Sequence, residues 1–440
     1  MTEAEPPRGR DELIASYRRV RDLTERLAEP LSPEDQVLQS MPDASPTKWH
    51  RGHTTWFFET FVLAPLGVPP YDARFAKILN SYYVSLGPRH PRPARGMLSR
   101  PSCDEIAEYR RVVDGRVIES LLAADETKLA EIVPLIDLGL AHEQQHQELL
   151  LTDIWHALSQ NPLAPSYRSD SARERALGMD QGEGHAISTP IRFVGFDGGL
   201  VEIGTDRGGG FHYDNEEPSH RVWLEPFELA DRLVTVGEWK AFAEAGGYET
   251  PSLWLSAGFD WVRTHGIEAP LYTRREGSAL VGFGLDGERE LGDAEPITHV
   301  SYYEADAIAA FLDARLPTEA EWETAAKGDP SRGNFVDTGP EDSPLRAQAA
   351  REHEGVRQLF GDAWEWTRSA YEPYPGFRIP DGAIGEYNGK FMIDQQVLRG
   401  GSCLTPRGHM RASYRNFWPA ATRFQFTGIR LARSTGGERA

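Results

Sequence analysis

Four long stretches in the first part of the chain carry apolar side chains at the three-to-four spacing of a helix with one buried face. They cover residues 11–31, 45–66, 104–122 and 125–158. Ser45 and Pro46 predict the start of the second helix, as a capping residue followed by proline in the first turn. One long loop, residues 67–103, separates the second helix from the third. This pattern predicts a four-helix bundle over residues 1–160.

The character of the sequence changes near residue 191. Residues 161–190 are rich in Ser, Arg and Gly and only weakly patterned, which predicts a linker. From residue 191 to 440, short β-like runs alternate with glycine-rich loops and with two predicted helices, residues 236–245 and 304–313. We therefore expect a multidomain protein, with an α-helical first domain and an α+β second domain.

The charge and cysteine content exclude several classes of protein. The net charge is −20, from 47 Lys and Arg against 67 Asp and Glu, whereas a general binder of nucleic-acid backbones needs a basic face. Cys103 and Cys403 are the only cysteines, which excludes a disulfide-stapled secreted scaffold. The first residues lack the apolar core of a signal peptide, and no run approaches the ~18 apolar residues of a membrane span. We expect a cytoplasmic protein with neither a nucleic-acid nor a membrane partner.

The segment HEQQHQE, from His142 to Glu148, is the most informative for chemistry. His142 and His146 are four residues apart and therefore lie on one side of a helix, so both imidazoles can reach one metal ion. The second predicted helix carries His50 and His53, also on one face. The core of a bundle can bring one of these two to the pair.

Three interpretations of these histidines remain open. They can be ordinary core or surface residues. They can belong to an HExxH zinc hydrolase in which Glu143 is the general base, although Leu149 replaces the glycine of the extended form of that motif. They can also form a three-histidine site for non-haem iron, whose neutral nitrogens leave up to three positions open for two substrates and oxygen. Spacing alone does not separate zinc from iron.

Motifs of the second half resemble a known family. In chain order they are PSHRV (218–222), PITHVS (296–301), RLPTEAEWE (315–323), WEWT (364–367), LRGGS (398–402), RASYR (411–415) and GIR (428–430). They resemble the formylglycine-generating-enzyme/sulfatase-modifying fold, a C-type-lectin-like domain, over residues 191–433. We interpret most of them as scaffold, in which buried tryptophans and Arg–Glu pairs tie loops together. Formylglycine formation itself is not expected, because it needs two reactive cysteines, and Cys403 is expected to be a buried, inert thiol.

A helical bundle with an H-x-x-x-H-x-E helix, joined to such a domain, resembles the sulfoxide synthases of ergothioneine biosynthesis over nearly the whole chain. The resemblance implies a DinB-type bundle that holds Fe(II). It also implies an enzyme that joins a thiol to C2 of the imidazole of Nα-trimethylhistidine (hercynine) and oxidises the sulfur with O₂. The implied iron ligands are His53, in GHTTWFF, with His142 and His146. His50 then has a supporting or packing role, and Glu148 supports the site beside His146.

The same resemblance implies the other site residues. Tyr82 and Tyr83 resemble the paired tyrosines of the family branch that takes free cysteine, and either would be the catalytic proton donor. Tyr387 is a poorer match to the tyrosine of the branch that takes γ-glutamylcysteine. Arginine forks suit carboxylates, and aromatic faces suit a quaternary ammonium. The implied substrate-binding residues are Arg92 and Arg95 for the thiol's carboxylate, Gln145 for the imidazole, Asn416, Phe417 and Trp418 for the betaine, and Asp43 for a substrate amine.

Several alternative functions remain. Free cysteine is the expected sulfur donor, and γ-glutamylcysteine or a selenosugar are the alternatives within the same fold. The histidine-using ovothiol branch is disfavoured, because it usually carries an added methyltransferase domain and only seven residues follow residue 433. From other classes, a zinc hydrolase and a non-catalytic carbohydrate- or peptide-binding module remain, since a fold does not by itself imply a function.

Overall fold

The computed structural model describes residues 9–81, 83, 85, 87, 89–168, 190–206, 210–326, 328, 330–338, 345–351, 355–380 and 388–435. These residues form two compact units. The first extends to residue 168 and includes the short stretches 210–211 and 379–380, and the second contains the other described residues from 190 onward. Most of the predicted linker lies outside the described residues. Within the described part, no helix combines the length and the apolar character needed to cross a membrane.

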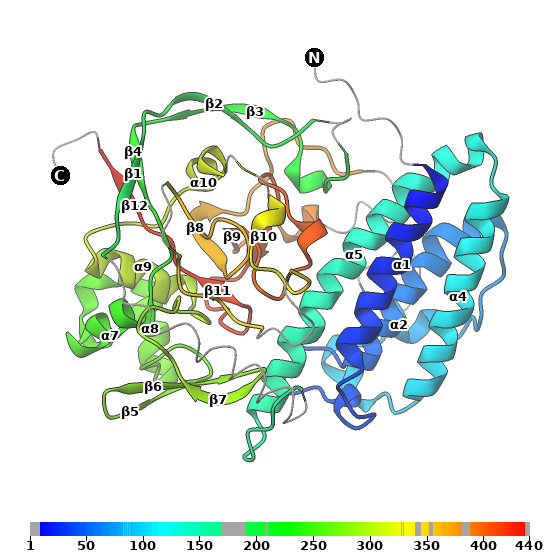
Figure 1. The fold of residues 1–440 in the computed structure, drawn as a ribbon, viewed down its shortest axis with the longest axis horizontal. Helices are drawn as coiled ribbons and strands as arrows, with labels where there is room; N and C mark the ends of the chain where they lie inside the picture. The colour runs from blue at the N-terminus through cyan, green and yellow to red at the C-terminus, as the bar shows by residue number, and fades with distance from the viewer. Residues whose placement is uncertain are drawn as a thin grey trace. The chain divides into compact units, whose positions relative to one another are not determined.

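Four long helices, which lie side by side in Figure 1, build the first unit. They are α1 Arg10–Ala28, α2 Thr47–Phe58, α4 Cys103–Ala123 and α5 Glu126–Ser159. Their apolar stripes meet in one shared core, with α2 packed against both α4 and α5. Ser102 caps α4 by accepting a hydrogen bond from the Glu105 N–H, and Asp125 caps α5 by accepting one from the Lys128 N–H. The predicted four-helix bundle is confirmed.

The start of α2 differs from the prediction. Pro46 is the N-cap residue, and no side chain caps the helix. Ser45 does not act as a cap, because its Oγ accepts a hydrogen bond from the Arg95 guanidinium at 2.8 Å. Beyond Phe58 the chain continues as a π-helical turn, Glu59–Leu63, and a 3₁₀ turn, Ala64–Leu66. A tertiary contact has replaced the local capping bond that the sequence suggested.

The long loop between α2 and α4 is partly helical. It contains the single-turn helix α3, Ala76–Leu79, and a 3₁₀ segment, Arg92–Met97. α3 packs against α2. This contact places the backbone carbonyl of Leu79 beside the histidine-bearing face of α2.

The second unit is α+β, as predicted. The strands of its four sheets in the described residues, each in spatial order, are β1 Phe193–Phe196, β4 Phe227–Ala230 and β12 Ala432–Ser434; β10 Asn416–Trp418, β9 Gln396–Arg399, β8 Trp364–Ala370 and β11 Thr427–Gly428; β2 Gly199–Ile203 and β3 His220–Leu224; and β5 Thr273–Glu276, β6 Ala279–Gly284 and β7 Gly287–Glu290. All neighbouring strands are antiparallel except β11, which runs parallel to β8. The helices of this unit are α7 Val236–Glu244, α8 Ser256–His265, α9 Tyr302–Phe311 and α10 Glu319–Ala325.

The predicted β-like run over residues 220–230 is two strands. β3 pairs with β2, whereas β4 lies in a different sheet between β1 and β12. Pro226 separates them, and proline lacks the N–H that a continuous ladder would need. The helices predicted at 236–245 and 304–313 correspond to α7 and α9. The sequence did not predict α8, α10 or the β5–β7 sheet.

Buried ion pairs hold the loops of the second unit together, as expected from its motifs. Arg430 of the GIR motif donates from Nε and Nη2 to both carboxylate oxygens of Glu365 in WEWT, at 2.7 Å each. The Trp322 indole donates to the same carboxylate at 2.6 Å. All three side chains are fully buried, and so is the Cys403 thiol. These motifs therefore act as scaffold in this unit.

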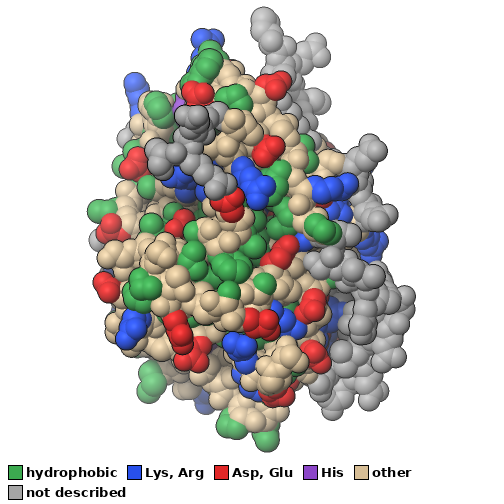
Figure 2. All heavy atoms as spheres, turned by 90° about the vertical axis from the view of Figure 1, so that its left-hand side faces the viewer, with side chains coloured by type: hydrophobic (Ala, Val, Ile, Leu, Met, Phe, Trp, Pro, Cys, Tyr) green, Lys and Arg blue, Asp and Glu red, His purple; other side chains and the backbone are tan. Residues whose placement is uncertain are grey.

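The described surface in Figure 2 mixes charges of both signs. Basic and acidic side chains are interspersed there, with apolar side chains among them. Among the described residues on this face, no large area is exclusively basic. A nucleic-acid interface would need such an area, so this face agrees with the inference from net charge.

Candidate metal centre

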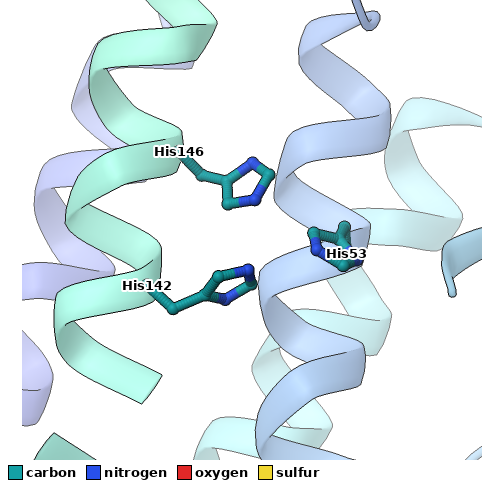
Figure 3. Close-up of side chains that lie close together, drawn as sticks. All are labelled: His53, His142 and His146. Atoms are coloured by element: carbon teal, nitrogen blue, oxygen red, sulfur yellow. The ribbon is translucent and has the colours of Figure 1, made fainter. Parts of the chain in front are cut away.

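Three imidazoles converge in the core of the bundle. His53 comes from α2, and His142 and His146 come from successive turns of α5. One potential ligand atom of each lies within 4.8 Å of the others, and all three residues are buried. Figure 3 shows the three rings pointing toward a common point between the two helices. The i, i+4 spacing on α5 aligns two of them, and the packing of α2 against α5 supplies the third.

His53 is oriented by the backbone of α3. Its Nδ1 lies 2.6 Å from the carbonyl oxygen of Leu79. A carbonyl only accepts hydrogen bonds, so Nδ1 carries the proton and Nε2 carries a lone pair. That Nε2 atom is buried and has no hydrogen-bond partner among the described residues. The Trp49 ring stacks on His53 with centroids 4.5 Å apart, which fixes the plane of the imidazole.

His146 is oriented by a second histidine. Its Nδ1 lies 2.8 Å from Nδ1 of His50, and Nε2 of His50 lies 3.0 Å from a carboxylate oxygen of Asp153. All three side chains are buried. His50 is therefore not a member of the converging triad, and it contacts the triad through His146, as its predicted supporting role requires.

Burial keeps the three imidazoles neutral. It lowers the pKa of His142 to about 3 and lowers the pKa values of His53 and His146 well below their ordinary value of 6.5. Neighbouring imidazoles lower the pKa values of His53 and His146 further, as does the Arg95 cation. At neutral pH the site thus offers three neutral nitrogen donors. Neutral imidazole is the form of histidine that binds a metal ion.

Glu143, the remaining acidic residue of the HExxH pattern, is engaged elsewhere. One of its carboxylate oxygens accepts a hydrogen bond from Arg21 Nη1 at 2.7 Å. The other accepts from Arg110 Nη2 at 2.9 Å and from the Thr24 hydroxyl at 2.6 Å. Despite complete burial, these two cations hold the pKa of Glu143 at about 2. A carboxylate so saturated is a weak base held toward α1 and α4, and this geometry argues against the zinc-hydrolase interpretation.

Two family models match this chain. The DinB superfamily matches residues 16–157, and the sulfatase-modifying factor enzyme 1-like domain matches residues 185–354 and 341–435. The first match covers the histidine-bearing helices and the second covers the α+β unit. The predicted fold class, a DinB-like bundle followed by a domain of the formylglycine-generating-enzyme type, is confirmed.

Three relatives match most of the chain and share one description. The hercynine oxygenases of Mycobacterium tuberculosis and Mycolicibacterium smegmatis are each 29% identical to it, over 96% of this chain and 98% and 99% of theirs. The hercynine oxygenase of Mycolicibacterium thermoresistibile is 30% identical over 78% of each chain. This chain belongs to the hercynine oxygenase family. The family resemblance predicted from the sequence is therefore confirmed, and the convergent histidines lie in the part of the chain that these relatives match.

The predicted proton donors of this hercynine oxygenase relative lie in the loop after α3. Tyr82 lies outside the described residues, as does Tyr387. Tyr83 is buried, and its ring packs against Phe61 and Trp56. Trp56 in turn lies against the His53 ring, with centroids 5.7 Å apart. The structure thus places Tyr83 in the aromatic cluster that adjoins a candidate ligand, and its role as a proton donor stays a prediction.

Of the two predicted carboxylate anchors, Arg95 lies nearer the triad. Its guanidinium carbon lies 3.4 Å from the centroid of the Trp49 ring, which itself stacks on His53. Its two terminal nitrogens donate to the hydroxyls of Ser45 and Ser81 at 2.8 and 2.9 Å. This arrangement sets a buried cation behind the ring that covers a candidate ligand.

Arg92 and Asp43, two further predicted substrate contacts, meet each other. The Arg92 guanidinium donates a hydrogen bond to the backbone carbonyl of Asp43. Asp43 is exposed and Arg92 is partly buried. Of the α5 residues, Gln145 is partly exposed and Glu148 is buried. For all four residues, the contacts with substrate or ligand stay predictions.

Asn416, Phe417 and Trp418, the predicted betaine contacts, form strand β10 of the second unit. One face of the Phe417 ring is covered by Tyr371, with ring centroids 3.9 Å apart and nearly parallel planes. The Trp418 indole nitrogen is buried without a hydrogen-bond partner among the described residues. The aromatic character of the strand agrees with the predicted chemistry, and its ligand stays a prediction.

Sequence reasoning missed three contributors to the centre. Asp153 lies seven residues after His146, which places it on the same face of α5 two turns later. Trp49 lies four residues before His53 and therefore stacks on it along α2. Helical spacing could have indicated both. The Leu79 carbonyl had no signal in the sequence, because a backbone acceptor is placed only by the packing of α3.

Proposed function

We propose that this chain is an Fe(II)-dependent sulfoxide synthase of ergothioneine biosynthesis that acts in the cytoplasm. It joins the sulfur of L-cysteine to C2 of the hercynine imidazole. The thiol and C2 each lose one hydrogen, one atom of O₂ becomes the sulfoxide oxygen, and the other leaves as water. The observation that carries the proposal is the convergence of three buried, neutral imidazoles in a member of the hercynine oxygenase family.

The donor set fits iron(II). Three neutral nitrogens from two helices bind one side of an ion and leave the other positions open, which is the arrangement of non-haem iron sites that handle oxygen. His53 supports this fit, because a buried nitrogen lone pair without a hydrogen-bond partner is costly unless it binds something. The ion would supply the electrons for O₂ reduction and a single place where both substrates and O₂ meet.

The side chains around the histidines would shield and orient the reaction. Trp49 and Trp56 lie on His53, and Phe57 lies 4.7 Å from His142 between ring centroids, so the ligands are surrounded by aromatic rings. Such surroundings exclude water and limit the release of partly reduced oxygen. In our proposal, Tyr82 or Tyr83 donates the proton that directs the reaction toward C–S bond formation.

The proposed substrate contacts follow the charges of the two substrates. Arg92 and Arg95 would bind the carboxylate of the thiol substrate through bidentate hydrogen bonds. Gln145 would hold the hercynine imidazole. Asn416, Phe417 and Trp418 would hold the betaine, since a trimethylammonium group cannot donate a hydrogen bond and is attracted to aromatic faces. Asp43 would pair with a substrate amine.

The test is an aerobic assay of the Fe(II)-loaded full-length protein with hercynine. L-Cysteine, γ-glutamylcysteine and a selenosugar are offered separately, and oxygen uptake is followed together with product mass. We expect hercynylcysteine sulfoxide from cysteine, with one O₂ consumed per product. A product from another donor only would assign the chain to that branch of the family.

Two controls separate this proposal from its rivals. Protein loaded with Zn(II) in place of Fe(II) should consume no oxygen, because zinc has no redox chemistry. His53→Ala should abolish turnover, whereas a non-catalytic binding module would keep its ligand affinity. Absence of oxygen uptake with every donor, in protein of verified iron content, would refute the synthase proposal.

A further inference from the structure

We propose that Asp153 and His50 are positioning residues that hold the proton of His146 on Nδ1 and thereby direct the Nε2 lone pair of His146 at the metal. The inference rests on the proposed function in taking His146 as a ligand. His50 and Asp153 themselves lie outside the triad. They connect to it through the 2.8 Å contact of His50 with His146 and the 3.0 Å contact of His50 with Asp153.

The direction of each hydrogen bond follows from the carboxylate. An ionised carboxylate only accepts hydrogen bonds, so Nε2 of His50 must donate to Asp153. A neutral His50 then has its lone pair on Nδ1, and Nδ1 of His146 must donate to it. The proton of a neutral His146 is therefore on Nδ1, and its Nε2 is left as the donor atom for a metal.

Asp153 is held in place for this contact. The oxygen that faces His50 also accepts a hydrogen bond from the backbone N–H of Ser45 at 2.7 Å, just before α2 begins. The side chains of Asp153 and His50 are each at least nine-tenths buried. Among the described residues, no arginine or lysine lies within ion-pair distance of Asp153, and His50 is its one such partner. Its charge therefore acts on the histidine chain and is not neutralised by a cation.

His53 offers an internal comparison. Its Nδ1 donates to the Leu79 carbonyl, so its lone pair also lies on Nε2. The two ligands therefore present the same nitrogen by different means: a backbone carbonyl for one and a side-chain chain ending in a carboxylate for the other. Only the second can be altered by mutation, and it also places a negative charge near the metal, which should strengthen binding of the cation.

The primary measurement is the tautomer of His146 in the metal-free, full-length protein, by nitrogen NMR of ¹⁵N-histidine-labelled samples. We expect the Nδ1–H form in the wild type. His50→Phe removes the acceptor and should shift His146 toward the Nε2–H form, which free imidazole side chains prefer. His50→Gln should rescue the Nδ1–H form, because its amide oxygen can accept from His146 while its NH₂ donates to Asp153.

The second measurement is the affinity for Fe(II), determined anaerobically by chelator competition. His50→Phe and Asp153→Leu should each weaken binding by about 10–100-fold, the usual effect of removing a partner of a metal-bound histidine. His50→Gln should bind within a few-fold of the wild type.

Glu59→Leu is the matched control for Asp153→Leu. Glu59 is an equally buried carboxylate of the same bundle that also accepts one side-chain and one backbone hydrogen bond, from the Tyr109 hydroxyl at 2.8 Å and the Tyr71 N–H at 2.6 Å. It should lose stability without losing Fe(II) affinity in the folded protein.

Two results would overturn the inference: an Nε2–H tautomer of His146 in the wild type, or an unchanged tautomer and Fe(II) affinity in His50→Phe. If His50→Phe does not fold, the wild-type tautomer and Asp153→Leu decide the matter. Failure of the proposed function has a different signature. Wild-type protein that shows the Nδ1–H tautomer but binds no Fe(II) would refute the iron site and leave the positioning chain established.

Discussion

Two adjacent faces of α5 carry buried polar residues at the same i, i+4 spacing. One face has His142 and His146, and the other has Glu143 and Gln147. The Glu143 carboxylate accepts three hydrogen bonds from α1 and α4, and the Gln147 amide donates to the Val20 carbonyl and the Thr24 hydroxyl at 2.7 and 2.9 Å. On the histidine face the rings are neutral, and they converge with the His53 Nε2 lone pair, which has no protein partner in the described residues.

The difference separates a structural cluster from a candidate reactive one. Buried charges are tolerated when hydrogen bonds and opposite charges compensate them, and such a saturated cluster holds helices together. A site for a metal instead needs lone pairs that the protein leaves available. The same helix achieves both by turning one pair toward α1 and α4 and the other toward α2.

The largest effect should follow removal of a candidate ligand. His142→Ala should reduce Fe(II) affinity and oxygen consumption by about 10³-fold or more, since loss of even an outer partner of a ligand costs 10–100-fold. The metal-free protein should keep its fold, because no charged partner is lost. Metal titration and thermal unfolding of the metal-free protein measure the two effects. Wild-type iron binding in this variant would show that the histidine face is structural.

Breaking the other face should have the opposite signature. Glu143→Gln leaves Arg21 and Arg110 without their shared buried carboxylate and should lower the free energy of unfolding by about 3–5 kcal/mol. Fe(II) affinity and turnover per folded molecule should be preserved. Denaturant unfolding and activity corrected for the folded fraction test this. Loss of activity with unchanged stability would instead support a general base at Glu143.

A third buried carboxylate sharpens the contrast between compensated and uncompensated charge. Asp362 of the second unit accepts hydrogen bonds from the Asn334 side chain and the Gln348 N–H, and burial raises its pKa to about 6. Its folded pKa lies above the unfolded value of 3.8, so the protein loses stability as pH rises from 3.8 through 6. Glu143, with a pKa of about 2 against 4.5, has the reverse dependence: its contribution is present above pH 4.5 and is lost toward pH 2.

Asp362→Asn should therefore stabilise the protein at pH 8, by about 2–3 kcal/mol at most. Asparagine keeps an oxygen acceptor and tolerates the left-handed backbone of this residue, whose φ is 57°. The gain should shrink as the pH is lowered toward 4. Unfolding curves followed by tryptophan fluorescence at several pH values measure it. A gain that does not depend on pH would contradict the raised pKa.

The smallest effect is expected at the neutral member of the structural face. Gln147→Ala removes two hydrogen bonds to α1 and no charge, so it should lower the free energy of unfolding by about 1–2 kcal/mol. Iron affinity should not change. Thermal unfolding with and without Fe(II) checks both statements. An effect as large as that of Glu143→Gln would mean that packing, and not charge, dominates this face.

Much of the fold was predictable because the bundle depends on local patterns. The apolar stripes predicted α1, α2, α4 and α5 nearly to their ends, since a helix buries residues at a fixed spacing. The second unit was less predictable. Its strands are short, and the run 220–230 contributes to two different sheets, which only long-range pairing decides.

The metal centre shows the same limit at the level of single residues. Sequence placed His142 and His146 on one face of one helix, and it placed His50 and His53 together on another. Resemblance to the family selected His53. The structure supplies the physical reason, because the Leu79 carbonyl orients His53 toward the pair, whereas His50 turns to Asp153.

The sequence by itself determined that this chain has a helical half and an α+β half, and that two histidines share one helical face. Only the tertiary structure decided that Glu143 is an internal counter-ion, that Ser45 binds Arg95 instead of capping α2, and that Asp153 joins the histidine cluster. The physical reason is that periodicity fixes the direction of a side chain from its own helix. What the side chain meets depends on which neighbouring helix packs there.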